Sequence, residues 1–217
     1  MRLIHISDVH LDERRQLAGA IRVDDQGHNL ALTNTGACIR AVRDAALALG
    51  AVDVWVITGD LFDTPNPTQL EERYAVEVVE ELAATAPVVV LAGNHDVPLA
   101  GTGATALECL KLRANIHVVE LPQVLVVCPG LALACIPYPR RAELIALAPE
   151  GSREERYAAA SQELKRLIQG LRIKAEREHP GTPKVALYNA SQDGAVVGVQ
   201  PRALTCDNAV HPDDFMR

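Results

Sequence analysis

The chain has 217 residues, of which 48% are hydrophobic, and a formal net charge of −7 at pH 7. This length and apolar content suit an α/β domain with a full-sized core, and they exclude a wholly disordered chain. The negative charge argues against tight nonspecific binding of nucleic acid through bulk electrostatics, but it is compatible with a nucleic-acid substrate.

The first half of the chain alternates short apolar strands with helices. Buried or half-buried strands are predicted at residues 2–7, 52–58 and 88–91. Apolar residues with helical spacing predict helices from about Thr35 to Gly50 and over residues 70–82. Residues 13–33 are polar and predict a long surface loop. Strands alternating with helices indicate an α/β layered fold with parallel pairing in this half.

The second half predicts a similar but looser succession. A short helix is expected over residues 104–112, and Ser152 and Glu155 form a capping box for a helix that runs to about Lys174. The strands predicted here cover residues 117–119, 124–128, 131–136 and 185–187. We expect no separate linker between the two halves.

Cysteine usage and the N-terminal sequence indicate a cytoplasmic protein. The five cysteines are scattered and contain no CxxC pair, so we expect them to be reduced core thiols. Residues 1–7 lack the apolar length of a signal peptide, and no apolar run approaches a membrane span.

Three of the predicted strands are followed directly by residues typical of metal ligands. These segments are Asp8-Val9-His10, Gly59-Asp60-Leu61-Phe62-Asp63 and Gly93-Asn94-His95-Asp96. Each alone is typical of a helix cap or a turn, but their succession after hydrophobic strands favours a functional site. Because parallel strands bring their carboxyl ends to one edge of the sheet, these side chains are expected to converge there. Carboxylate with imidazole suits Mn²⁺, Fe²⁺ or Zn²⁺ better than Ca²⁺.

The motifs D-x-H, G-D-x-x-D and G-N-H-D, in this order, resemble those of the calcineurin-like metallophosphoesterases. Residues 59–67 (GDLFDTPNP) resemble the DNA-repair exonuclease branch with its SbcD-type nuclease subunit, and residues 7–11 and 136–139 fit that branch as well. The resemblance covers essentially the whole chain. It implies a four-layer αββα sandwich of two mixed sheets, formed as one nuclease domain over residues 1–217.

The resemblance also implies a site with two divalent metal ions, Mn²⁺ foremost, with Mg²⁺, Fe²⁺ or Zn²⁺ as alternatives. Asp8 and His10 would hold one ion, Asp60 would bridge both, and Asn94 would bind the second. His95 would lie beside the scissile phosphate and would stabilise the transition state or protonate the leaving oxygen.

Further roles follow from the same resemblance. Asp63 and Asp96 would orient the ligands. The expected partners are DNA, as the phosphodiester substrate, and an SbcC-type ATPase subunit; a homodimer is compatible with this assembly, and no membrane is expected.

The chain departs from the family at its later histidines. The family has a histidine after a later strand, where this sequence has Asn189, or Tyr188 if the register slips by one. It then has a G-H-x-H motif, which is absent here, so we expect the domain to lack that C-terminal segment. Weak metal binding and low turnover are therefore expected of the chain alone.

Several interpretations of this departure stay open. The chain is a truncated or inactivated nuclease, a catalytically impaired homologue that binds DNA ends or an ATPase partner, or a protein whose missing ligands come from a partner. A small-molecule phosphoesterase is a less favoured interpretation of the same motifs.

Overall fold

The computed structural model describes residues 1–98, 104–139, 151–189, 196–197 and 200–201. The chain divides into two compact units, Met1–Glu120 and Leu121–Arg217, and each is described by itself. None of the helices in the described ranges combines the length and apolar character needed to cross a bilayer.

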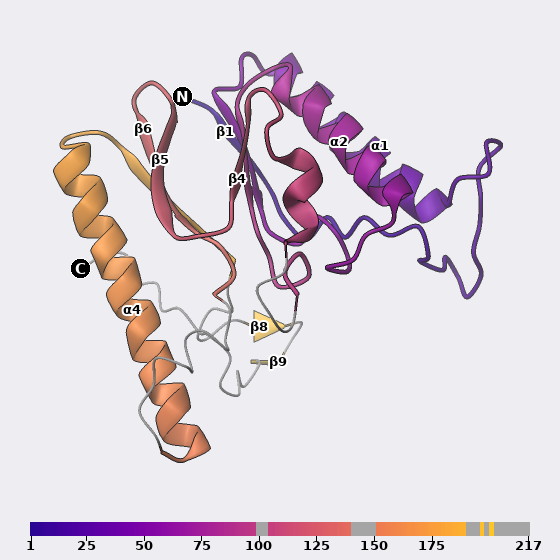
Figure 1. The fold of residues 1–217 in the computed structure, drawn as a ribbon. Coiled ribbons are helices and arrows are strands. Elements are labelled where there is room, and N and C mark those ends of the chain that lie inside the picture. Colours follow the sequence, from indigo (N-terminus) through magenta and orange to yellow (C-terminus); the bar gives the residue numbers. More distant parts are fainter. Residues whose placement is uncertain (99–103, 140–150, 190–195, 198–199, 202–217) are drawn as a thin grey trace. The chain divides into compact units, whose positions relative to one another are not determined.

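A parallel four-stranded sheet forms the centre of the first unit (Figure 1). Its strands, in spatial order, are β1 (Leu3–Ile6), β2 (Val54–Thr58), β3 (Val88–Leu91) and β4 (Ile116–Val119). All residues of the central strands β2 and β3 are buried, which explains why their sequences are continuously apolar. The parallel pairing predicted for this half of the chain is confirmed.

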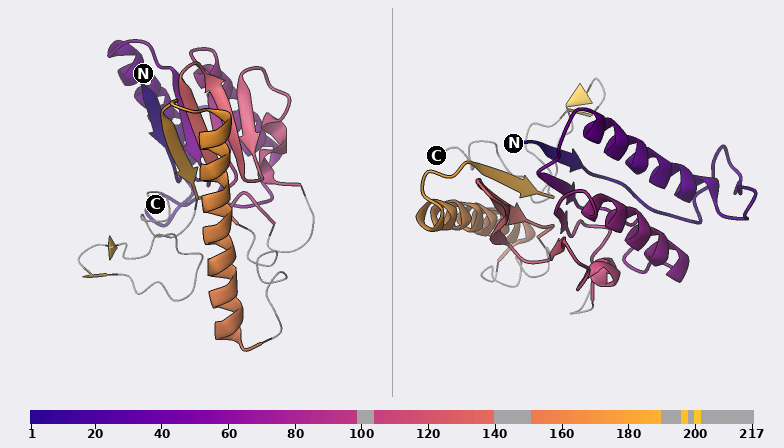
Figure 2. Two further views of the ribbon diagram at one scale, coloured as in Figure 1. Left: turned by 90° about the vertical axis from the view of Figure 1, so that its left-hand side faces the viewer. Right: turned by 90° about the horizontal axis from the view of Figure 1, so that it is seen from above.

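Two helices, α1 (Leu30–Ala48) and α2 (Gln69–Ala83), lie side by side against this sheet (Figures 1 and 2). The predicted start of α1 near Thr35 is wrong, because the side chain of Asn29 accepts a hydrogen bond from the Ala31 N–H and begins the helix five residues earlier. Helix α2 begins with a reciprocal capping box between Thr68 and Glu71.

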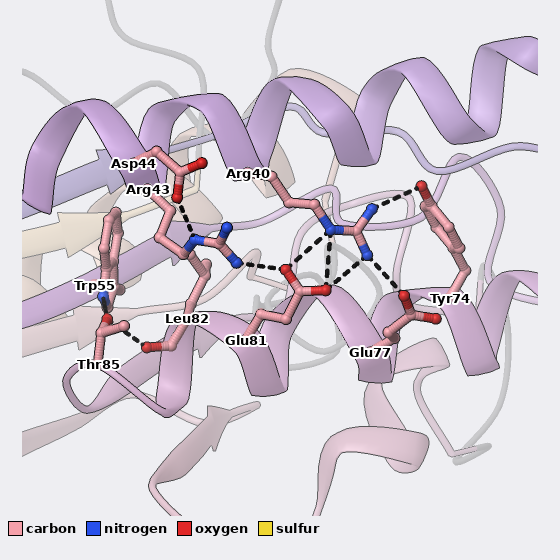
Figure 3. Close-up of polar contacts among 9 residues, drawn as sticks. All are labelled: Arg40, Arg43, Asp44, Trp55, Tyr74, Glu77, Glu81, Leu82 and Thr85. Carbon is pink, nitrogen blue, oxygen red and sulfur yellow. Dashed lines mark hydrogen bonds and ion pairs between the residues drawn. The ribbon is translucent and has the colours of Figure 1, made fainter.

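A network of charged side chains joins α1 to α2 (Figure 3). The Arg40 guanidinium donates to both carboxylate oxygens of Glu81 at 2.7–2.9 Å, and also to Glu77 and the Tyr74 hydroxyl. Arg43 donates to the second Glu81 oxygen. The hydrogen bond from Arg40 is the main cause of the lowered pKa of Glu81, so this carboxylate is ionised at neutral pH.

The second unit contains a mixed three-stranded sheet. Strand β5 (Gln123–Cys128) pairs antiparallel with β6 (Leu131–Ile136), and β7 (Lys184–Tyr188) pairs parallel with β6. Helix α4 (Arg153–Glu178) begins at the predicted capping box and continues four residues past its predicted end.

The face of α4 toward this sheet is apolar. Leu164, Ile168 and Leu171 form a buried cluster with Ile136 of β6, with Tyr188 packed against it. This face, spaced at three and four residues, anchors a helix whose remaining surface is charged.

The remaining described elements are short. The helix predicted over residues 104–112 is a 3₁₀ helix, η1 (Ala106–Leu110), and β8 (Val196–Val197) pairs with β9 (Gln200–Pro201). The described residues thus form an α/β fold with two main sheets and flanking helices, which is the predicted fold class.

Candidate metal centre

The loops that follow β1 and β2 bring three metal-type side chains together. Potential ligand atoms of Asp8, His10 and Asp60 all lie within 4.8 Å of one another. Asp60 is buried with 5% of its surface exposed, whereas Asp8 is exposed and His10 half-buried. The convergence follows from the parallel pairing of β1 with β2, which places both strand ends at the same edge of the sheet.

The backbone at these positions is unusual. Asp8, His10 and Asp60 have φ values of 53°, 50° and 56°, in the left-handed region that L-residues rarely adopt. Such conformations cost roughly 1–3 kcal/mol each and persist where surrounding contacts over-determine them. Here the His10 N–H donates to the Asp60 carbonyl at 2.9 Å, so the two strained loops hold each other.

A second group joins the third loop to the first two. Ligand atoms of His10, Asp63 and His95 also lie within 4.8 Å of one another. The His95 ring approaches the His10 ring edge to face, with centroids 4.8 Å apart. Nδ1 of His95 lies 2.9 Å from the Asp63 carbonyl oxygen, so the loops after β2 and β3 are joined through this histidine.

The Nδ1 atom of His10 supports a cation site. It is buried and lies 3.0 Å from an Asp63 carboxylate oxygen, but the two atoms are misaligned for a hydrogen bond, and the atom has no such partner among the described residues. Buried polar atoms normally find one. An imidazole held in this way among carboxylates is a donor set that suits a divalent transition metal, so the residues present fit such an ion.

Asp96 is fully buried and ties two of the loops together. Its carboxylate accepts N–H hydrogen bonds from Asp60 at 2.9 Å, Phe62 at 3.0 Å and Gly93 at 2.8 Å. Burial raises the pKa of Asp96, and these three donors oppose that rise by favouring the ionised form. The side chain therefore organises the site from beneath.

Residues 1–146 match the sequence profile described as calcineurin-like phosphoesterase. The chain belongs to this family. It is 33% identical over 153 residues to the SbcD subunit of the nuclease SbcCD from Bacillus subtilis (strain 168), which supports the SbcD-type nuclease branch of the family. That alignment covers 66% of this chain but only 35% of the relative, so the chain spans about a third of the relative's length.

Among solved structures, the Pseudomonas putida nuclease MPE matches with 22% sequence identity. The match covers 64% of this chain and 56% of that chain, with a TM-score of 0.33.

The remaining positions expected from the calcineurin-like phosphoesterase motifs lie in both units. Asn94 is exposed in the loop after β3, next to His95. Asn189 directly follows β7, and its N–H donates to the Ile136 carbonyl at 3.1 Å. Residues 190–195, which follow the position of the expected histidine, lie outside the described residues, as does the chain after residue 201.

Two buried polar residues near the centre were missed by the sequence analysis. Glu71 and Asn29 bind the backbone of the segment that follows His10. The T-x-x-E pattern at residues 68–71 was a readable sign of a helix cap, but nothing in it revealed the contact to a segment 58 residues away.

Proposed function

We propose that this chain is a metal-dependent phosphodiesterase, and that it is a DNA exonuclease or endonuclease subunit of the SbcD type. The observation that carries the proposal is the convergence of Asp8, His10 and Asp60 to within 4.8 Å at the ends of two neighbouring parallel strands. Family membership and the similarity to the SbcD subunit of SbcCD support the same reaction class.

The proposed ligands come from all three loops. Asp8 and His10 would hold one divalent ion, Asp60 would contribute to both, and Asn94 would bind the second. Such ions, with Mn²⁺ as the first candidate, supply hydroxide near neutral pH and neutralise phosphate charge when bound. The protein contributes rigid placement, because Asp60 is held from behind by the N–H of His95 at 3.0 Å.

His95 is proposed to assist the leaving oxygen. A carbonyl oxygen only accepts hydrogen bonds, so the 2.9 Å contact with the Asp63 carbonyl requires a proton on Nδ1 of His95. This contact fixes the ring and leaves Nε2 for the substrate. In the imidazolium form, Nε2–H would donate its proton to the departing oxygen.

The assembly is also a proposal. We propose an SbcC-type ATPase as the partner, since the Bacillus subtilis relative is by name a subunit of SbcCD. A single nuclease domain over residues 1–217, a homodimer and a cytoplasmic location stay predictions.

A second candidate is a catalytically silent module that binds DNA ends or the ATPase partner. Asn189, at the end of β7 where the family has a histidine, favours it. An amide oxygen is a weaker ligand for a borderline metal than imidazole.

Mn²⁺ titration by calorimetry, combined with cleavage assays, tests the proposal. Cleavage of linear duplex DNA should require Mn²⁺, and Asp60→Asn should weaken Mn²⁺ binding and abolish cleavage. Asp25→Asn removes an equal charge from an exposed loop and should change neither.

The other outcomes separate the alternatives. A wild-type chain that binds no Mn²⁺ would refute the enzyme and favour the silent module. Cleavage of a small chromogenic phosphodiester without cleavage of DNA would refute the nuclease assignment and indicate a small-molecule phosphoesterase.

A further inference from the structure

Two buried polar side chains converge on the segment that follows the proposed ligand His10. Glu71 has none of its surface exposed, and Asn29 has 5% exposed. They stand at the N-termini of α2 and α1, so both are helix-capping residues. Each also binds the backbone of Glu13.

The Glu71 carboxylate uses its two oxygens for different segments. One oxygen accepts the Thr68 N–H at 2.7 Å and closes the capping box of α2. The other accepts the Glu13 N–H at 2.8 Å. A capping box is satisfied equally by glutamine, so capping alone does not require both oxygens to be acceptors. The contact with Glu13 does require it.

Asn29 divides its side-chain amide in the same way. Its oxygen accepts the Ala31 N–H at 2.7 Å and caps α1. Its nitrogen donates to the carbonyls of Glu13 at 2.6 Å and Arg15 at 3.0 Å. Both polar groups of the Glu13 backbone are therefore held by buried side chains from two helices.

This anchor is continuous with the metal centre through the backbone. The N–H of Leu11 donates to the Leu61 carbonyl at 2.9 Å, and the Leu11 carbonyl accepts the Asp63 N–H at 3.3 Å. Leu11 is fully buried. His10 lies one residue before this bridge in its left-handed conformation, and Glu13 lies two residues after it.

We propose that Glu71 and Asn29 are positioning residues for His10, which hold the strained backbone after β1 in the conformation that presents its imidazole to the metal. The inference rests on the function proposed above. Strained backbone needs fixed points on both sides, and the β1–β2 pairing supplies only the one that precedes Asp8. The buried contacts to Glu13 supply the other.

Two matched substitutions separate positioning from helix capping. Glu71→Gln keeps the size of the side chain and the capping oxygen, but it offers one acceptor to two N–H groups. Asn29→Asp keeps a favourable N-cap oxygen but removes both donors to the carbonyls of Glu13 and Arg15. Thr68→Ala is the control, because it removes the hydroxyl that caps α2 and leaves Glu13 untouched.

The readouts are Mn²⁺ affinity by calorimetry and amide hydrogen exchange along residues 8–15. We expect Glu71→Gln and Asn29→Asp each to weaken Mn²⁺ binding by about 10-fold, the lower end of the range for partners that orient a ligand. Amide exchange at Glu13 and Leu11 should accelerate in both. Thr68→Ala should lower the unfolding midpoint without either change.

The failure of this inference differs from the failure of the proposed function. If the wild type binds Mn²⁺ and both substitutions leave the affinity and the exchange of residues 8–15 unchanged, the positioning role is refuted alone. Equal weakening of Mn²⁺ binding by Thr68→Ala would also refute it, because capping would then explain the effect. A wild-type chain that neither binds Mn²⁺ nor cleaves phosphodiesters would refute both.

Discussion

Gly93→Ala is expected to damage the candidate metal centre through a collision with Asp60. A Cβ at position 93 would lie 2.2 Å from Oδ1 and 2.3 Å from the backbone nitrogen of Asp60. Non-bonded heavy atoms prefer separations of roughly 3.5 Å, so the two loops would have to move apart by about 1 Å. The loops cannot separate without stretching the hydrogen bonds of the Gly93 and Asp60 N–H groups to Asp96.

The expected loss of stability is about 1–3 kcal/mol, the usual cost of an inserted methyl group in a close-packed site. Urea unfolding measures it, and calorimetry measures the Mn²⁺ affinity, which should fall in parallel. Gly170→Ala is the matched control. Position 170 lies inside α4 with no atom within 4 Å of its Cβ, so alanine there should be neutral or stabilise by up to about 1 kcal/mol.

The reasoning would be wrong if Gly93→Ala unfolded at the wild-type urea concentration and bound Mn²⁺ with wild-type affinity. That result would mean that the loop after β3 can move away from Asp60 at no cost, and that the contact between the two loops does not organise the site.

Three further predictions concern other parts of the two units. Asp96→Asn leaves one of three buried N–H donors without an acceptor, so urea unfolding should show a loss of about 1–3 kcal/mol. Arg40→Met should reduce stability at neutral pH and flatten its pH dependence below 4.5. The lowered pKa of Glu81 stabilises the fold above its ordinary value of 4.5, and this contribution is lost as the pH falls through the lowered value, which stability curves at several pH values would detect. Leu164→Ala should cost about 2–5 kcal/mol in thermal or urea unfolding, because the side chain is buried between α4 and its sheet; a cost below that of an exposed Leu49→Ala would contradict this packing.

The strands were predictable because each is a short apolar run between polar segments. The observed β2 and β3 fall within the predicted ranges 52–58 and 88–91, and the helix after Ser152 begins where its capping box indicated. The start of α1 was mispredicted, because Asn29 caps a first turn whose residues 30–33 looked like the end of a polar loop. A single side chain decided that boundary.

The sequence by itself determined which residue types follow each strand, and with them the family and the expected ligands. Asp8, His10, Asp60, Asn94 and His95 were all identified from motif order. Their chemistry depends on local composition, which a sequence displays directly.

Only the tertiary structure decided how those side chains are held. The left-handed backbone of His10, the burial of Asp96 beneath two loops and the contact from Glu71 to Glu13 depend on residues that are far apart along the chain. A buried carboxylate is stable only where it meets N–H donors. Which donors it meets is set by the packing of helices on the sheet, since the spacing of residues along the chain carries no record of that packing.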